Sequence, residues 1–423
     1  MEIIDNVILG AGIAGLGASY ALHRRNKSSV VFEKDDTYGG LCGNFVIDGF
    51  RFDRFVHFTF SKNEDVNAIF RSSSSEMYYH KPEAYNLYKR KWIKHPAQNN
   101  LFPLEDAEKN LIIEDFLHRK SPDEAPIRNY EDWLRIQFGD YFAEHFPMVY
   151  TKKYWMKEAK YLRTEWVGQR VYQPSIEEVI EGSKTNDTPI TYYAKEMRYP
   201  QKGGYKAFLK DLARVADIRY GKEVMTIDVN AQQIIFTDKT TIGYKHLISS
   251  LPLPEMVKMI KNVPSDIKMA SEQLEATSGY HISVAFKNNN IPPYLWWYIY
   301  DEDILASRVH SPSMKSPDNA PEGCGSIQME VYCRENEYTK EQLIDGTVGK
   351  LCQLGIIRKE DIRFIHIGFE KYANVIFTEP IYRARKIVRD YLNEYGIKTI
   401  GRFGEWDYLW SDQSLLSGLN TKI

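Results

Sequence analysis

The sequence has little of what would tie it to a secreted, metal-binding or membrane-spanning class of protein. Its four cysteines in 423 residues form no C-x-x-C pair and no metal-ligand spacing. We therefore expect free thiols in a reducing compartment and no metal site. No basic segment followed by an apolar stretch opens the chain, and no apolar run approaches the ~18 residues needed to span a bilayer. A cytoplasmic protein without a membrane span is expected.

The sequence also has no excess of positive or negative charge. Lysine and arginine number 55 and aspartate and glutamate 57, for a net charge of −2. This balance gives no electrostatic reason for a nucleic-acid or membrane-surface partner, so an anionic ligand would have to be met by local arginines. The length exceeds that of one hydrophobic core and predicts two or three domains. The oligomeric state is left open.

Glycines are placed where a dinucleotide requires them. An apolar strand at 6–9 is followed by Gly10, Gly12 and Gly15 in the pattern G-x-G-x-x-G, which opens a helix, and a second strand at 29–33 ends on Glu33. The first glycine permits the tight turn, the second lets the backbone approach a pyrophosphate, and the third allows close packing of helix on strand. The helix N-terminus favours phosphate charge. The pattern predicts a Rossmann-like βαβ unit with Glu33 on the ribose hydroxyls.

A second diglycine, Gly39-Gly40, favours FAD over NAD, because it lets the chain pass close to the flavin side of the cofactor. The acidic Glu33 argues against the 2′-phosphate of NADP. Together with the first motif, this arrangement resembles the FAD superfamily that includes amine oxidases, protoporphyrinogen oxidase and UDP-galactopyranose mutase. We expect tight, non-covalent FAD.

The remaining sequence predicts an α/β fold in which the FAD-binding domain is discontinuous. Residues 64–184 have mostly helical periodicity, and the chain returns to α/β character at 198–250. Short aromatic and β-branched runs predict an antiparallel sheet. The expected domains are a FAD-binding domain (1–62, 196–275 and 363–423), a mostly helical substrate domain (63–195) and an antiparallel-sheet domain (276–362).

Several segments, in the same order along the chain, resemble UDP-galactopyranose mutase, and the eukaryotic type more than the classical bacterial one. This resemblance implies a nucleotide-sugar substrate. The segments are KWIKHPAQNN (91–100), WVGQRV (166–171), MRYPQKGG (197–204), TTIGYKHLISSLPL (240–253) and GRFGEWDY (401–408).

The resemblance also implies a substrate clamp built from arginines. Arg170 and Arg308 fall where the family binds the diphosphate, and His57 falls beside the isoalloxazine ring, so these three are the expected catalytic residues. Arginine suits the clamp because its planar, permanently charged fork donates paired hydrogen bonds to phosphate. The expected substrate contacts further include Tyr85 near the uridine, Trp155 in the substrate domain, and Tyr298 and Tyr408 at the diphosphate.

Further cofactor contacts follow from the two glycine motifs and from the resemblance. In the family a C-terminal loop caps the flavin and a helix then points its N-terminus at the pyrimidine end. Here that helix is expected to begin at Ser417 and Gly418 and to be nearly absent, because only five residues follow. The further expected contacts are Ala14, Lys34, Leu41, Val224, Gly401, Arg402, Asp412, Gln413 and Ser414.

The chain departs from the family at two places near the expected active site. Phe55 and Val56 stand where the family has two glycines before the flavin-side histidine. Asn374 stands where the family has a tyrosine on the diphosphate, although the nearby Tyr372 is a possible substitute. These differences leave open which sugar and which base are used, and whether mutase activity is altered or lost.

Three functions are compatible with these motifs. The first is a mutase that interconverts pyranose and furanose forms of a nucleotide sugar, UDP-galactose being the best guess. By resemblance it acts through an adduct between the sugar and N5 of the reduced flavin, with an external reductant that the sequence does not name. The second is a FAD-dependent oxidase or desaturase, and the third a non-catalytic flavoprotein. The absence of a Ser/His/Asp set or paired carboxylates agrees with catalysis by the cofactor.

Overall fold

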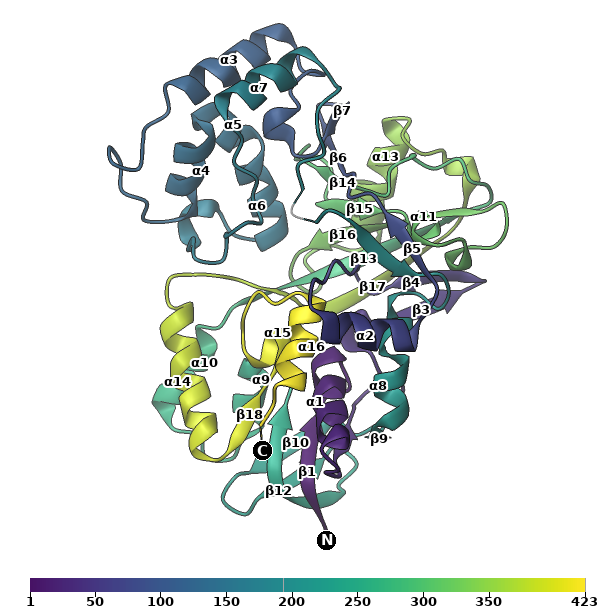
Figure 1. Ribbon diagram of the computed structural model, residues 1–423, viewed down its shortest axis with the longest axis vertical. Coiled ribbons are helices and arrows are strands. Elements are labelled where there is room, and N and C mark those ends of the chain that lie inside the picture. The colour runs from purple at the N-terminus through teal and green to yellow at the C-terminus, as the bar shows by residue number, and fades with distance from the viewer. Residues whose placement is uncertain (193, 423) are drawn as a thin grey trace.

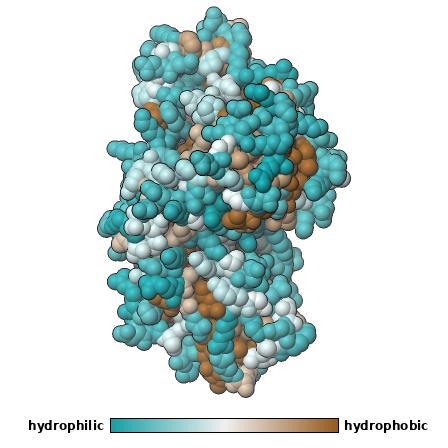
Figure 2. All heavy atoms as spheres, turned by 90° about the vertical axis from the view of Figure 1, so that its right-hand side faces the viewer, coloured by the Kyte–Doolittle hydropathy of each residue, from teal (hydrophilic) through white to brown (hydrophobic). Residues whose placement is uncertain are grey.

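The computed structural model describes residues 1–192 and 194–422. Figure 1 shows three regions: a parallel-sheet region that holds both ends of the drawn chain, a group of helices at the opposite end, and an antiparallel sheet beside them. The face seen in Figure 2 is mostly hydrophilic, and its apolar side chains gather in separate patches at mid-height and near the lower end. Among the described residues, no helix combines the length and apolar character needed to cross a membrane.

The parallel-sheet region is built on the predicted βαβ unit. Its strand order is β10-β11-β12-β1-β2-β9, with β18 pairing β12. Val7, Ile8 and Leu9 in β1 are at most 1% exposed, as expected for a strand covered on both faces. The strands are β1 (Glu2–Leu9), β2 (Val30–Phe32), β9 (Asp217–Arg219), β10 (Val224–Asp228), β11 (Gln233–Phe236), β12 (Thr241–Ser249) and β18 (Ile397–Thr399).

Helices cover this sheet on both faces (Figure 1). Helix α1 (Ile13–Arg24) leads out of the glycine turn and packs closely against the C-terminal helix α16 (Ser411–Leu419). The close approach depends on small residues, since a Cβ on Gly418 would stand 2.1 Å from the Ala14 carbonyl oxygen. The other helices here are α2 (Glu64–Ser73), η4 (Tyr205–Leu209), α8 (Lys210–Val215), α9 (Leu253–Met259), α10 (Ser265–Glu272), α14 (Ile381–Glu394) and α15 (Gly401–Gly404).

The start predicted for the closing helix was wrong. Helix α16 begins at Ser411, and Ser417 and Gly418 lie towards its C-terminal end. The reason is an N-terminal cap, in which Gln413 Oε1 accepts a hydrogen bond from the backbone N–H of Trp410 at 2.9 Å. This cap satisfies one of the free N–H groups at the helix start, so the chain forms a helix of nine residues instead of a remnant.

The antiparallel sheet has the strand order β17-β13-β16-β15-β14-β6-β7. It includes strands from outside the predicted range 276–362. Strand β17 lies in a segment predicted for the FAD-binding domain, and β6 and β7 lie in the segment predicted for the mostly helical domain. These pairings join segments far apart in the sequence, which local periodicity does not report. The strands are β6 (Tyr85–Tyr88), β7 (Lys91–Lys94), β13 (Ala276–Phe286), β14 (Trp296–Ile299), β15 (Arg308–His310), β16 (Gly325–Tyr332) and β17 (Ile362–Val375).

The helical region forms as the sequence predicted for most of residues 106–184. Its buried side chains are largely aromatic, with Phe142 and Phe146 stacked at 4.5 Å between ring centroids. The helices are α3 (Asp106–Leu117), α4 (Tyr130–Phe138), α5 (Asp140–His145), α6 (Pro147–Trp155) and α7 (Ile176–Lys184).

Two short ribbons join the regions. Strand β3 (Asn44–Ile47) pairs β4 (Phe50–Asp53), and β5 (Met77–His80) pairs β8 (Met197–Pro200). The short helices of the remaining chain are η1 (Gly40–Cys42), η2 (Ala97–Asn99), η3 (Ala159–Tyr161), α11 (Pro312–Lys315), η5 (Pro317–Asn319), α12 (Lys340–Ile344), η6 (Asp345–Gly349), α13 (Lys350–Gln353) and η7 (Lys359–Asp361).

Candidate active site

Three adjoining cavities run from the glycine motif into the helical region. We call them the cofactor cleft, about 680 Å³, the middle cavity, about 200 Å³, and the aromatic cavity, about 210 Å³. The cofactor cleft and the middle cavity share Leu41, His57 and Arg402. The middle and aromatic cavities share Arg308 and Tyr408, among others. The shared lining residues place the three cavities side by side.

Backbone geometry shapes the cofactor cleft. Gly10 has φ +93°, which favours glycine, and a Cβ on Gly15 would stand 1.9 Å from the Gly10 carbonyl oxygen. A Cβ on Gly12, by contrast, would meet nothing within 4 Å. Gly15 therefore packs helix on strand, whereas Gly12 borders open space that a pyrophosphate can use. Gly39 bridges Gly12, which places the second glycine motif against the first.

Glu33 holds the shape of this cleft. Its side chain is 7% exposed; Oε2 accepts from the N–H of Ala11 at 2.8 Å and Oε1 from the N–H of Asp35 at 3.0 Å. Both are charge-assisted hydrogen bonds. Glu33 thus fixes the two loops on either side of the cleft, a role that the motif alone did not predict, and its contact with a ribose stays a prediction.

The structure brings most of the predicted cofactor residues to one cleft. Three do not line it: Gly15 lies beneath the turn, Gln413 caps α16, and Asp412 lines the middle cavity instead. Arg54, which the sequence analysis missed, also lines the cleft and lies 3.3 Å from Asp35 and 3.6 Å from Glu370. The predicted residues that line the cleft are Gly10, Gly12, Ala14, Glu33, Lys34, Gly39, Gly40, Leu41, Val224, Gly401, Arg402 and Ser414.

His57 borders both the cofactor cleft and the middle cavity. Burial lowers the pKa of His57 to about 4, so the ring is neutral at pH 7. Its Nδ1 lies 2.9 Å from the carbonyl oxygen of Phe55. A carbonyl only accepts, so Nδ1 carries the proton and Nε2 is the acceptor nitrogen. The residues before His57 are held as well, since the N–H of Val56 donates to Glu330 at 3.2 Å and Phe55 stacks on Tyr332.

Arg308 lines the middle cavity but is already paired. Its Nε and Nη2 donate to Glu330 Oε2 at 2.9 and 2.6 Å, and the Glu330 side chain is fully buried. The Tyr332 hydroxyl donates to the same oxygen at 2.7 Å. The charge of Arg308 is therefore largely neutralised within the protein, and the arginine is fixed in place. Glu330 could not be found from the sequence, because its partner lies on the neighbouring strand.

Arg170 and Arg402, in contrast, form no ion pair with any residue in 1–192 or 194–422. Arg170 donates to the carbonyls of Trp166 and Tyr408, both at 2.9 Å. Its guanidinium lies over the rings of Tyr408 and Trp410, at 4.6 and 4.9 Å from the centroids, and Arg402 lies over Tyr408 at 4.8 Å. These rings and carbonyls hold both cations in place without cancelling their charge.

The orientation of Asn374 follows from its neighbours. Arg402 Nη2 lies 2.6 Å from Asn374 Oδ1, and a guanidinium can only donate, so this branch must carry the oxygen. Tyr154 also donates to Oδ1, at 3.1 Å. The amide nitrogen Nδ2 is then left buried without a hydrogen-bond partner among the described residues, in a residue that lines the middle cavity. Tyr372 does not replace Asn374, since it lines the cofactor cleft and bonds Glu255.

The predicted aromatic residues divide into two groups. Tyr298, Tyr408 and Trp155 line the aromatic cavity. Tyr85 lines none of the three cavities; it contacts Tyr294 at 4.2 Å between ring centroids. Tyr85 is therefore placed apart from the residues with which it was predicted to bind substrate. Sequence reasoning missed Tyr154, Trp166, Tyr332 and Trp410, for which a high aromatic content was the only signal.

Among residues 1–192 and 194–422, no three His, Cys, Asp or Glu side chains are grouped so that they could hold a metal ion.

The first comparison with known proteins supports the dinucleotide-binding domain. Residues 8–73 match a family model described as an NAD(P)-binding Rossmann-like domain. Over 379 residues the chain is 23% identical to the phytoene desaturase of Fusarium fujikuroi, a match that covers 76% of this chain and 65% of the desaturase. The chain thus spans a little less than two thirds of the length of that curated relative.

Solved structures extend the likeness to the whole chain. Reduced UDP-galactopyranose mutase superposes with a TM-score of 0.92 at 23% identity, covering 98% of this chain and 94% of that one. Cyclohexylamine oxidase from Brevibacterium oxydans IH-35A gives 0.69 at 12% identity, with 98% and 97% covered. Putrescine oxidase bound to putrescine gives 0.67 at 14% identity, with 99% and 97% covered.

These likenesses bear on the predicted α/β fold and on the cofactor. The glycine turns, the Glu33 loops and the open space beside Gly12 fit a dinucleotide. The predicted fold class, its resemblance and the FAD cofactor are confirmed, while the residues that contact FAD stay a prediction. The chain has the fold of UDP-galactopyranose mutase, with a Rossmann-like FAD-binding domain.

Proposed function

We propose that this protein is a flavin-dependent mutase that interconverts the pyranose and furanose forms of a nucleotide sugar, with UDP-galactose as the first candidate. One observation carries the proposal. Arg170 and Arg402 line the aromatic and middle cavities with no carboxylate partner among the described residues, and their Nε atoms form no hydrogen bond within those residues. Each orphaned atom is a donor, so the fitting ligand is rich in acceptors and carries negative charge. A diphosphate has both properties.

The residues of the chain have separable roles in this reaction. FAD, when bound and reduced, supplies a nucleophilic ring nitrogen for the anomeric carbon. Arg170 and Arg402 bind the diphosphate and stabilise the charge that develops as it leaves. Arg308, held by Glu330, positions the substrate more than it attracts it. The neutral His57 offers Nε2 as a hydrogen-bond acceptor beside the cofactor cleft.

The second candidate is a FAD-dependent oxidoreductase, which the desaturase and the amine oxidases named above favour. Two features of the cavities oppose it. Phytoene is a hydrocarbon and would leave the buried donors unpaired, at a cost of about 1–3 kcal/mol each. An amine substrate is a cation and would be repelled by Arg170 and Arg402, which have no carboxylate partner within the described chain.

The deciding experiment incubates the dithionite-reduced, FAD-loaded protein with UDP-galactose, UDP-glucose and GDP-mannose and separates the products by chromatography. We expect a ring-contracted isomer of one sugar, many turnovers per flavin, no net consumption of reductant, and no turnover by the oxidised protein. Oxygen consumption by the oxidised protein would establish the oxidoreductase instead. UDP binding without turnover of any sugar would identify a non-catalytic flavoprotein.

A further inference from the structure

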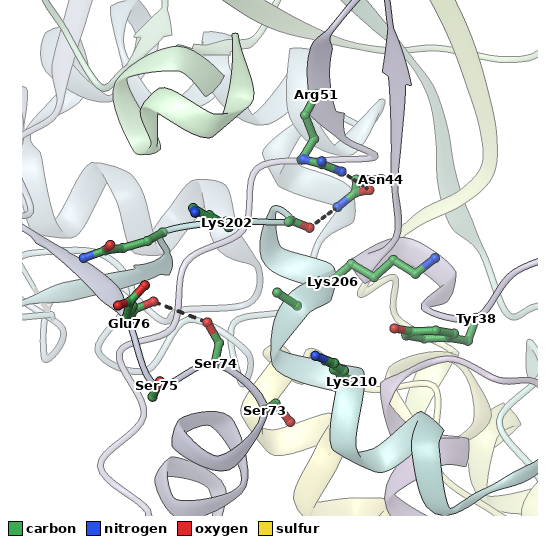
Figure 3. A pocket seen from close by; sticks show the side chains of 13 residues that line it. Tyr38, Asn44, Arg51, Ser73, Ser74, Ser75, Glu76, Lys202, Lys206 and Lys210 are labelled. Atoms are coloured by element: carbon green, nitrogen blue, oxygen red, sulfur yellow. Dashed lines mark hydrogen bonds between the residues drawn. The ribbon is translucent and has the colours of Figure 1, made fainter. Parts of the chain in front are cut away.

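A separate pocket of about 560 Å³ lies outside the proposed active site and shares no lining residue with its three cavities. We call it the outer pocket. Figure 3 shows Arg51, Lys202, Lys206 and Lys210 around this hollow, with Ser73, Ser74 and Ser75 along one wall. The basic residues come from β4, from the loop after β8 and from the η4–α8 segment, so the fold gathers them from separate parts of the chain.

The outer pocket has a surplus of positive charge. Four basic side chains line it against one acid, Glu76, and Asp318 beside the pocket pairs with Arg51, so two positive charges are left without an acidic counterpart. Lys202 and Lys210 are exposed and form no ion pair with any residue of the described chain, 193 and 423 lying outside it. This cluster therefore has two lysines that no ion pair of the described chain neutralises.

The two deeper cations are only weakly compensated. Lys206 contacts the Thr37 hydroxyl and lies over the Tyr38 ring at 4.3 Å, with no carboxylate partner among the described residues. Burial and the neighbouring Arg54 and Arg51 lower the pKa of Lys206. Arg51 donates to Asn44 Oδ1 at 3.3 Å and lies 3.6 Å from Asp318, a long ion pair.

The wall that carries Lys202 is held rigidly. Gly203 and Gly204 have φ values of +85° and +69°, and a Cβ on Gly204 would stand 2.4 Å from Asn44 Nδ2. This diglycine lets the loop approach the β3–β4 ribbon, where Asn44 Nδ2 donates to the Gly203 carbonyl at 2.8 Å. The segment MRYPQKGG, identified above by its resemblance to the mutase family, thus also fixes Lys202 at the rim of a preformed hollow.

We propose that the outer pocket is a second ligand site, which binds a small molecule carrying two or more phosphate groups. Ammonium groups are effective point charges for phosphate oxygens, and the serine hydroxyls of the wall add neutral donors. A ligand with a single negative charge would leave part of the surplus uncompensated. The hollow is concave and bounded by several segments, which suits a small molecule better than an extended macromolecule.

Inorganic tripolyphosphate is a suitable probe, titrated calorimetrically into the FAD-loaded protein. The double variant Lys202→Ala/Lys210→Ala should bind it about tenfold more weakly, while FAD content stays normal because both side chains are exposed. Lys120→Ala, which removes an exposed lysine between α3 and α4, is the matched control and should bind like the parent. Arg170→Ala should retain binding at the outer pocket, which separates this site from the proposed diphosphate site.

A second measurement locates the probe directly. Tripolyphosphate should protect Lys202, Lys206 and Lys210 from amine acetylation, read by peptide mass spectrometry, and should leave Lys120 reactive. If the double variant binds like the parent, or if Arg170→Ala abolishes all binding and no lysine of the outer pocket is protected, the inference is wrong. None of these outcomes depends on whether a nucleotide sugar is turned over.

Discussion

The cofactor cleft and the aromatic cavity present hydrogen-bond donors by different means. The cleft uses backbone: glycine turns, a helix start, and two loops held by the Glu33 carboxylate. The aromatic cavity and its neighbour use side chains, with guanidinium groups held over rings and an amide turned by an arginine. A backbone site is disturbed by adding a single Cβ, whereas a side-chain site is disturbed by removing one. The two regions should therefore fail differently under substitution.

Within the cleft, Gly15→Ala and Gly12→Ala separate folding from cofactor binding. The new Cβ at position 15 would stand 1.9 Å from a backbone oxygen, so the free energy of unfolding should fall by about 3 kcal/mol or more. The Cβ at position 12 enters open space and should weaken FAD binding while the apoprotein keeps its stability. Urea unfolding and FAD content measure the two effects. Equal stability losses in both variants would remove the distinction between them.

Arg308→Ala should differ from Arg170→Ala in the free energy of unfolding, measured in urea. Removing Arg308 leaves the fully buried Glu330 charge unpaired, which commonly costs about 3–5 kcal/mol of stability. Arg308→Ala/Glu330→Gln should recover part of that loss. Removing Arg170 breaks no ion pair among the described residues, so the fold should be kept.

Arg170→Ala should bind UDP at least about tenfold more weakly by calorimetry, with FAD content unchanged, and Arg308→Ala should weaken UDP binding less, because Glu330 already neutralises Arg308. Lysine should not rescue either position, because a point charge cannot reproduce the planar fork. If UDP, CDP and dTDP bind both variants as they bind the parent, the arginine clamp does not exist. Loss of binding to one nucleotide alone would instead identify the base of the substrate.

Glu33→Ala tests the backbone site through a side chain. It removes two charge-assisted hydrogen bonds to loop N–H groups, each worth about 1.5–3 kcal/mol, as well as any bond to a ribose. FAD should therefore be released much faster than from the parent, as measured by flavin fluorescence after dilution. Glu33→Gln is the control: it keeps the shape and one acceptor, and its loss should be intermediate. Parent-like retention by Glu33→Ala would show that the loops hold without the carboxylate.

The smallest expected effect lies at Asn374. Asn374→Leu removes the donor Nδ2 and also the oxygen that accepts from Arg402 and Tyr154, and UDP should bind more weakly by about 0.5–1.5 kcal/mol. Asn374→Asp keeps an oxygen for Arg402 but places negative charge where the donor was, so it should bind UDP more weakly than the leucine variant. Calorimetry at constant pH compares the three proteins. Equal affinity in all three would show that Nδ2 does not contact the ligand.

Much of the backbone site was readable from the sequence. The glycine spacing, the apolar strand before it and Glu33 lie within about one βαβ unit, and local steric rules act over that range. Most residues predicted for the cofactor do line one cleft. The start of α16 was missed because a glutamine cap, not the glycine near the end, determines where that helix begins.

The side-chain site was readable only in part. Arg170, Arg308 and Tyr408 were identified by their resemblance to a known family, but the partner of Arg308 was not. Tyr85 lines none of the three cavities, so its predicted contact with the substrate stays a prediction. The orientation of the Asn374 amide is set by hydrogen bonds from Tyr154 and Arg402, and these two residues lie on helices far away in the chain.

The sequence by itself thus determined the fold class, the FAD-binding turn and the identity of the candidate cations. Only the tertiary structure decided which cations are neutralised: Arg308 by Glu330 on the next strand, and Arg170 and Arg402 by no carboxylate of the described chain. The reason is physical. Backbone conformation depends on neighbouring residues, whereas the effective charge of a buried side chain depends on which distant groups share its low-dielectric surroundings.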